Sequence, residues 1–212
     1  GTVYACGQNN YGQLGTGDRD TRIKFTKIGI NNVKQISCGE SHTAILKNDG
    51  TVYTSGYNNY GQLGTGDQNN RSTFTKINID NVKQISCGYE YTFMLKNDGT
   101  VYACGYNNYG QLGLGNQNNK STITKVNIDN VKQIECGYLH TFILKNDGTV
   151  WSCGDNSSGQ LGLGDTGDDE TIFTKVNIND VKQISCGGLH TAILKNTGSV
   201  WVCGSDRYGQ LG

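Results

Sequence analysis

Proline and net charge are both absent from this sequence. Its 212 residues include 18 basic and 18 acidic side chains, so the formal net charge at pH 7 is zero. A neutral chain lacks the long-range attraction to phosphate backbones that gives nucleic-acid-binding proteins much of their affinity, and the same holds for anionic membrane surfaces. No apolar run is long enough to span a bilayer. We therefore expect neither a nucleic-acid partner nor a membrane association.

Glycine, by contrast, is abundant, with 31 residues arranged in a regular repeat. The tetrapeptide GQLG occurs at residues 12–15, 61–64, 110–113, 159–162 and 209–212. Successive copies start 49 residues apart, except for a last interval of 50 that has its extra residue in the loop 165–171. Such a period, with β-branched segments and glycine turns, is typical of propeller blades, because helical solenoids show a 3.6-residue apolar rhythm instead. We predict that residues 1–212 form a single array of repeats.

Each repeat predicts four short strands, named A to D here. In the first copy, strand A covers Val33–Gly39 and strand B covers His42–Lys47. Strand C follows at Thr51–Gly56, after an Asn-Asp-Gly turn that is a strong hairpin signal. Strand D is the segment Phe25–Ile28. Four antiparallel strands make one blade, so the fold class we expect is all-β, a β-propeller of four-stranded antiparallel blades.

The strand count predicts about four blades and a partial one. Strand C occurs five times, whereas strands A, B and D occur four times each. A closed ring of four blades would leave the first strand C, Thr2–Cys6, without a place. We interpret the array as an arc of a longer propeller, and self-association through its cut edges is one way to cover them.

The repeat also has a recognisable signature. The pattern V-x-x-I-x-C-G-x-x-H-T-x-x-L-x-x-D-G-x-V-Y-x-x-G-x-N-x-x-G-Q-L-G covers essentially the whole chain and resembles the repeat of the regulator of chromosome condensation family. The resemblance implies a seven-bladed propeller. One departure is the proline that those repeats commonly carry before strand D, where this chain has residues such as Phe25 and Phe74.

Signatures of catalysis are missing. Histidine occurs only at His42, His140 and His190, one position of the repeat, where the second copy has Tyr91. A position that accepts tyrosine is a poor general base or metal ligand, so we expect an imidazole that is hydrogen-bonded within its blade. The GQLG segments lack the lysine and helix of a phosphate-binding loop. We predict no enzymatic activity, no catalytic residue and no cofactor.

The cysteines fit a structural role better than bridging or metal binding. They occupy the ends of strands A and C, which strand B separates, so two strand spacings hold them roughly 9 to 10 Å apart. That separation is too long for a disulfide. No CxxC pair exists, and unpaired cysteine behaves as a small core hydrophobe. The eight residues, which we expect to be buried thiols, are Cys6, Cys38, Cys87, Cys104, Cys136, Cys153, Cys186 and Cys203.

Comparison of the copies separates what a blade requires from what it permits. Alternating strand directions put the A-to-B turns and the loops after strand C on one face, and the B-to-C turns and D-to-A connections on the other. The second face is nearly identical in every copy, and we call it the constant face. The first differs, and we call it the variable face. Its candidate partner-binding residues are Gln8, Glu40, Tyr57, Tyr89, Glu90, Tyr106, Tyr138, Leu139 and Asp155.

Tyrosine provides a large rigid contact with a polar tip, so the four tyrosines of this set are expected to be exposed interface residues. Packing on neighbouring loops is the alternative. The loops before strand D change sign along the chain, which could orient a charged partner. They carry Arg19, Arg22, Arg71 and Lys120 in the early copies, and Asp168, Asp169 and Glu170 in the last. The acidic loop could also hold calcium, although it does not match an EF-hand.

The leading functional hypothesis is a non-catalytic scaffold that binds a protein partner. The resemblance implies two alternatives, guanine nucleotide exchange on a small nuclear GTPase and attachment to chromatin. A secreted bacterial inhibitor or surface-binding module is a third. Unpaired cysteines favour a reducing compartment, so we expect a cytoplasmic location, with a secreted or cell-surface one as the alternative.

All eight cysteines should react as thiols. Because strand B separates the equivalent cysteines of a blade, counting thiols under denaturing, non-reducing conditions should give eight. A count lower by two or more would overturn the geometric argument.

Overall fold

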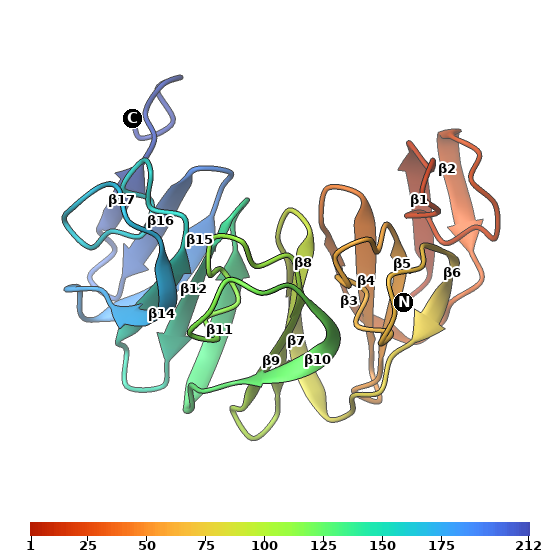
Figure 1. Cartoon of the computed structure of the whole chain (residues 1–212), viewed down its shortest axis with the longest axis horizontal. Helices are drawn as coiled ribbons and strands as arrows, with labels where there is room; N and C mark the ends of the chain where they lie inside the picture. Colours follow the sequence, from red (N-terminus) through yellow and green to blue (C-terminus); the bar gives the residue numbers. More distant parts are fainter. The chain divides into compact units, whose positions relative to one another are not determined.

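The computed structural model describes residues 1–212 and contains strands connected by turns and loops (Figure 1). None of its segments is a helix long and apolar enough to cross a membrane. The strands are β1 (Val3–Gly7), β2 (Arg22–Ile28), β3 (Val33–Cys38), β4 (His42–Lys47), β5 (Val52–Gly56), β6 (Arg71–Lys76), β7 (Val82–Cys87), β8 (Tyr91–Lys96), β9 (Val101–Gly105), β10 (Lys120–Val126), β11 (Val131–Cys136), β12 (His140–Lys145), β13 (Val150–Gly154), β14 (Glu170–Lys175), β15 (Val181–Cys186), β16 (His190–Lys195) and β17 (Val200–Gly204).

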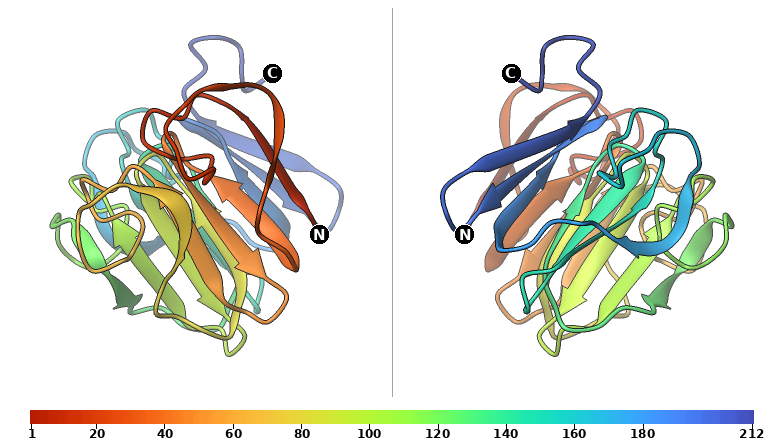
Figure 2. Two further views of the ribbon diagram at one scale, coloured as in Figure 1. Left: turned by 90° about the vertical axis from the view of Figure 1, so that its right-hand side faces the viewer. Right: turned by 90° about the vertical axis from the view of Figure 1, so that its left-hand side faces the viewer.

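The strands form separate antiparallel sheets, one for each predicted blade. Sheets of four run β3-β4-β5-β6, β7-β8-β9-β10 and β11-β12-β13-β14, which is the predicted order A-B-C-D. β1 and β2 supply a C and D pair, and β15, β16 and β17 supply an A, B and C set. The strands of one sheet can be followed side by side in Figure 2. The prediction of all-β, four-stranded blades is confirmed.

The chain divides into two compact units. The first is Gly1–Asn97 with Tyr102–Tyr106 and Asn119–Lys125. The second is Asp98–Val101, Asn107–Asn118 and Val126–Gly212.

Strand D begins earlier than the sequence predicted. β2 starts at Arg22 and pairs Gly7 with Arg22 across a bulge, so Phe25 lies inside the strand. Phe74 likewise lies inside β6. A proline at such a position would remove a backbone hydrogen-bond donor. Because this chain has phenylalanine there instead, the strand can continue through the position.

Turn chemistry explains the constant face. In each blade the residue that opens the B-to-C turn donates its backbone N–H to the D-to-A connection, as Asn48 does to the Asn32 carbonyl at 2.8 Å. The accepting residues adopt a left-handed backbone with φ between 56° and 63°, which asparagine and aspartate tolerate better than other side chains. They are Asn32, Asn81, Asn130 and Asp180. Backbone geometry therefore accounts for the near-identity of this face.

A threonine hydroxyl fastens each of the first four GQLG loops to the next blade. In the first unit, Thr92 Oγ1 on β8 donates to the Gln62 carbonyl at 2.8 Å. Thr43 donates to Gln13 in the same way. In the second unit, Thr141 donates to Gln111 and Thr191 to Gln160. The cysteine or serine on the neighbouring strand C points to the same carbonyl, with Cys104 Sγ 3.5 Å from the Gln62 oxygen.

The histidines belong to the same junctions and not, as predicted, to hydrogen bonds within one blade. His42 Nε2 lies 2.9 Å from Thr92 Oγ1, and His140 Nε2 lies 3.0 Å from Thr191 Oγ1. Because the Thr92 hydroxyl already donates to Gln62, the imidazole must be the donor. Burial lowers the pKa of both histidines to about 4, so they are neutral at physiological pH.

Glycine is required where these loops approach the next blade. Gly15 has a φ of 68°, and a Cβ there would lie 2.3 Å from the Phe74 ring. A Cβ on Gly12 would lie 2.4 Å from the Ser72 Cα. Both contacts are shorter than packed atoms allow, so the repeated glycines follow from close packing as well as from backbone conformation.

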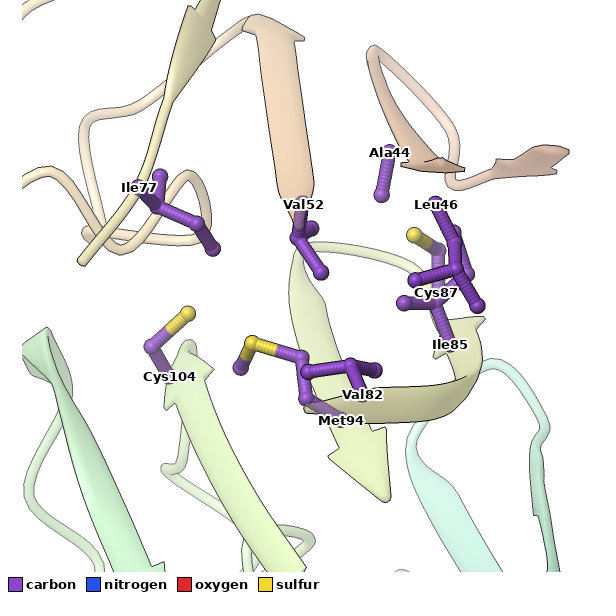
Figure 3. Packing of buried hydrophobic residues seen from close by; sticks show 9 residues of the cluster. All are labelled: Ala44, Leu46, Val52, Ile77, Val82, Ile85, Cys87, Met94 and Cys104. Atoms are coloured by element: carbon purple, nitrogen blue, oxygen red, sulfur yellow. The ribbon is translucent and has the colours of Figure 1, made fainter. Parts of the chain in front are cut away.

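Apolar side chains fill the space between blades within each unit. In the first unit, residues of β4 and β5 pack against residues of β7, β8 and β9 (Figure 3). The members of this cluster are Ala44, Leu46, Val52, Ile77, Val82, Ile85, Cys87, Met94 and Cys104. A second cluster, around Phe142 and Leu161, fills the second unit. Each fully buried aliphatic side chain stabilises the fold by about 1.5–3 kcal/mol.

All eight cysteines are free thiols. In β11, β12 and β13 the register runs from Cys136 through Thr141 to Cys153, so a threonine separates the two thiols as expected. The expectation of burial is wrong for Cys6 and Cys38, which are exposed, and holds only in part for Cys136, Cys186 and Cys203, which are half-buried. Cys38 lies on β3 and Cys6 lies on β1. The residues of these two strands are less buried than those of the corresponding strands β7 and β9.

Replacing Thr92 with valine should destabilise the protein by about 1–3 kcal/mol, because valine keeps the shape but leaves the His42 N–H buried without its partner and the Gln62 carbonyl with only the weak Cys104 thiol as a donor. Urea unfolding followed by fluorescence measures the change. Thr75→Val is the matched control, since Thr75 donates only to Thr73 in its own strand. Equal stability of the two variants would contradict the importance of the junction.

Candidate functional site

The structure brings the two kinds of variable loop together. In the four copies that have an A-to-B turn, the first residue after strand C donates its backbone N–H to that turn of the same blade. Tyr57 donates to Ser41 and Tyr106 to Glu90, each at 2.8 Å, in the first unit. Asp155 donates to Leu139 at 2.9 Å in the second. The argument from strand direction therefore placed these residues correctly.

A row of tyrosine rings lies on the variable face of the first unit. Tyr11 and Tyr57 have ring centroids 4.7 Å apart, Tyr57 and Tyr60 6.2 Å, and Tyr60 and Tyr106 4.9 Å. These are the separations of tilted and edge-to-face aromatic pairs. Their order along the face is Tyr11, Tyr57, Tyr60 and Tyr106, and we call this set the tyrosine row.

The sequence reasoning missed two members of the row. Tyr11 and Tyr60 occupy the position before GQLG, which holds Tyr109, Ser158 and Tyr208 in the other copies and was not among the candidate positions of the variable face. Their backbone N–H groups do have a structural partner, the side-chain oxygen of the GQLG glutamine. The motif Y-N-N-Y at residues 57–60, which places a second tyrosine beside a candidate one, was the signal available.

The exposure predicted for the four tyrosines holds for one of them. Tyr138 is 41% exposed in the second unit. Tyr57, Tyr89 and Tyr106 are half-buried. Neighbouring rings of the row pack against Tyr57 and Tyr106.

Glu90 is buried in the first unit, with 8% of its surface exposed, where an exposed contact residue was expected. The turn that carries it is bonded to the preceding blade's turn, since Glu40 N donates to the Tyr89 carbonyl at 3.1 Å. Burial raises the pKa of Glu90 to about 7, and the nearby charge of Glu40 adds to the effect. Burial also raises the pKa of Tyr57, and the Glu90 charge contributes.

Asp155 in the second unit is buried for a different reason. Its carboxylate accepts hydrogen bonds from Ser157 N at 2.9 Å and from Gln160 Nε2 at 2.8 Å, and it is 5% exposed. The side chain therefore shapes the GQLG loop from within. Its expected accessibility to a partner is wrong.

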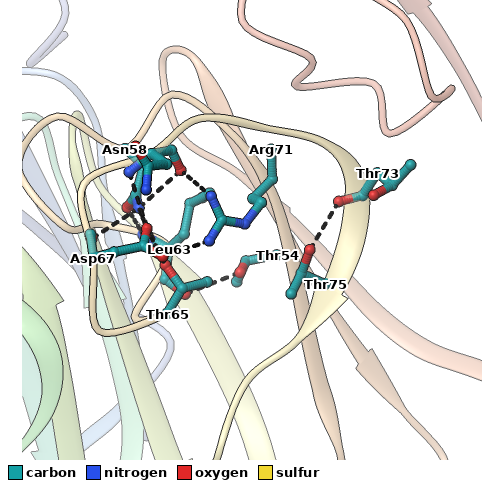
Figure 4. A network of polar contacts seen from close by, with 9 residues as sticks. Thr54, Asn58, Leu63, Thr65, Asp67, Arg71, Thr73 and Thr75 are labelled. Carbon is teal, nitrogen blue, oxygen red and sulfur yellow. Dashed lines mark hydrogen bonds and ion pairs between the residues drawn. The ribbon is translucent and has the colours of Figure 1, made fainter.

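The charged loops are also more self-contained than expected. Arg22 pairs with Asp18, four residues earlier. Arg71 pairs with Asp67 at the same spacing (Figure 4). Asn58 holds the same loop from inside, donating to Asp67 and accepting from Leu63 N. These arginines thus neutralise their own loops. Among the remaining charges of the set, Arg19 and Asp168 are exposed.

The acidic loop of the last copy does not assemble into a metal site. Thr174 donates to Glu170 at 2.9 Å, and burial raises the pKa of Asp169. No three side chains of the metal-binding types His, Cys, Asp and Glu group together anywhere in the chain.

Comparison with protein families matches the model described as "Regulator of chromosome condensation (RCC1) repeat" at residues 1–46, 49–95, 98–144 and 147–194. A second model with that description matches residues 33–62, 82–111, 131–160 and 181–210. Among curated proteins, the mouse X-linked retinitis pigmentosa GTPase regulator is 46% identical over 54 residues, which are 24% of this chain and 5% of that protein. The chain thus spans a small part of this relative.

Solved structures share the fold. Yeast RCC1 (Prp20), solved with Kap60, has a TM-score of 0.87 at 21% identity, over 97% of this chain and 52% of its own. Human WBSCR16 has a TM-score of 0.85 at 26% identity, over 95% of this chain and 56% of its own. The chain therefore corresponds to about half the length of these structures. The predicted β-propeller fold is confirmed.

Replacing Glu90 with glutamine should flatten the pH dependence of stability. Because the folded pKa of about 7 exceeds the ordinary 4.5, the folded state retains a proton that the unfolded chain releases. This favours folding below pH 4.5, and the advantage is lost as pH rises through about 7. Melting temperatures from pH 4 to 8 should fall less for Glu90→Gln than for the wild type.

Asp168→Asn, which alters an exposed carboxylate, is the control and should keep the wild-type profile. Parallel profiles for Glu90→Gln and the wild type would show that Glu90 titrates normally.

Proposed function

Because the chain belongs to the regulator of chromosome condensation (RCC1) repeat family, we propose that it is a non-catalytic scaffold that binds a protein partner through its variable face. The observation that carries the proposal is the contrast between the two faces. Left-handed residues and repeated hydrogen bonds account for the constant face, whereas blade geometry leaves the side chains of the variable face open to change. Surface residues that a fold does not require are the ones available for recognition.

The tyrosine row supplies suitable contact chemistry in the first unit. Its rings are held by one another before any partner arrives, so binding would cost little side-chain entropy. Rigid aromatic side chains with a polar tip are enriched at binding hot spots.

The second unit offers an apolar contact of its own. Tyr138 and Leu189 are exposed large side chains on neighbouring A-to-B turns. The two turns are joined by a hydrogen bond of 3.1 Å from Tyr138 N to the Gly188 carbonyl. This pair extends the chemistry proposed for the first unit to the second.

A small GTPase is a second candidate partner. The relative of 46% identity is named a GTPase regulator, and a structure of Prp20p from Saccharomyces cerevisiae, 25% identical with a TM-score of 0.79, is described with its binding to Gsp1p and histones. Release of fluorescent nucleotide from a small nuclear GTPase, with and without this protein, tests it. Accelerated release would favour exchange activity over a passive scaffold.

The thiols support a location in a reducing compartment such as the cytoplasm. All eight are free. Burial raises the pKa of Cys87 to about 12 and that of Cys203 to about 11, so these sulfurs are protonated and unreactive at neutral pH.

Alanine at Tyr57, Tyr89, Tyr106 or Tyr138 should weaken partner binding. If these side chains are hot spots, each substitution should cost about 1–4 kcal/mol of binding free energy, measured by affinity capture and then titration with the captured protein. Tyr102→Ala is the matched control, because Tyr102 lies on strand β9 beside Lys96, four residues before Tyr106. Retained affinity in all four variants, or an equal loss in the control, would contradict the proposal.

A further inference from the structure

Glu90 is a buried acid without a partner of its own. The ion pairs of the structure involve Asp18, Asp67, Asp80 and Asp129, and none involves Glu90. No donor is bonded to its carboxylate, although only 8% of the residue is exposed. Asp155, in contrast, is equally buried and has two donors. A buried carboxylate that lacks donors destabilises the free protein unless something else compensates it.

Blade geometry does not require an acid at this position. The other copies have Ser41, Leu139 and Leu189 there. An acid at this position therefore occurs in one blade only. The other blades fold without it, so folding does not require the destabilising carboxylate of Glu90.

The groups around Glu90 share one chemical preference. The bond from Glu40 N to the Tyr89 carbonyl brings a second carboxylate to the neighbouring turn. Tyr106 lies next to Glu90, because its backbone N–H donates to the backbone carbonyl of Glu90. Tyr57 lies close enough for the Glu90 charge to act on its hydroxyl. Two carboxylates on turns that adjoin tyrosine residues attract a cation.

The arrangement suits a guanidinium better than a metal ion. Calcium takes six to eight oxygen ligands and magnesium six, whereas only two carboxylates meet here and no group of three acidic or histidine side chains forms. A guanidinium is planar, binds a carboxylate through two parallel hydrogen bonds and stacks on aromatic rings. We propose that Glu90, Glu40, Tyr57 and Tyr106 form a recess in the first unit that takes an arginine side chain of a protein partner. The inference rests on the proposed function and names the chemistry of its partner.

The test uses capped arginine amide as the probe and capped citrulline amide as its neutral isostere. Each is titrated into the isotope-labelled full chain, and amide resonances are followed by NMR. The arginine probe should shift Tyr57, Glu90 and Tyr106, and the citrulline probe should not. Glu90→Gln should weaken the arginine probe by about tenfold or more. Glu135→Gln is the matched control, because Glu135 is a half-buried glutamate that accepts from Gln133 elsewhere in the chain.

A spectrum of Glu90→Gln that overlays the wild type away from the recess establishes that the variant is folded. Equal shifts with citrulline, or undiminished arginine binding by Glu90→Gln, would overturn the inference. So would calcium chloride alone shifting Glu40 and Glu90 at concentrations where the arginine probe does not. In those cases the scaffold function survives if the tyrosine variants still lose the partner. Arginine binding that depends on Glu90, with partner capture unaffected by every tyrosine variant, would support guanidinium recognition at Glu90 and overturn both the proposed binding face and the partner as the source of the arginine.

Discussion

The hydrogen bond from a strand B threonine to the glutamine carbonyl of the preceding repeat is the interaction on which each junction depends. It is buried, so neither group has water as an alternative partner. It also fixes the loop that carries the candidate site. The same Gln62 whose carbonyl receives Thr92 accepts the Tyr60 N–H through its side chain. One glutamine thus connects the packing of blades to the position of a ring in the tyrosine row.

The hydrogen bonds of the two faces explain why the side chains of one face can vary between copies and those of the other cannot. On the constant face the hydrogen bonds run between backbone groups whose conformation selects asparagine, aspartate and glycine. On the variable face they also run between backbone groups, but at residues whose conformation any side chain can adopt. Tyr57, Tyr106 and Asp155 occupy one such position. The backbone of the candidate site is therefore rigid while its chemistry is free to change.

Repetition made the fold predictable from sequence, and the same repetition limited the prediction of the site. Strand order followed from the spacing of VKQI, Asn-Asp-Gly and GQLG, and strand direction then placed Tyr57 beside Ser41. Burial at loop tips could not be predicted, because the turn of Glu90 is bonded to a turn some fifty positions away in sequence, where Glu40 N donates to the Tyr89 carbonyl. Tyr60 was not singled out, because the comparison of the copies considered the A-to-B turns and the first residue after strand C. The Asp67 and Arg71 pair was predictable, since opposite charges four residues apart in a short loop can meet.

The junction bond always runs in one direction, from a strand to the loop of the repeat before it. Each repeat therefore presents a hydrogen-bond acceptor to one neighbour and a hydrogen-bond donor to the other. Duplication or loss of one whole period joins matching surfaces wherever the genetic event occurs. The number of blades can then change during evolution without a change in any junction. Each copied variable loop is initially redundant, so mutations in it can produce binding to a new ligand.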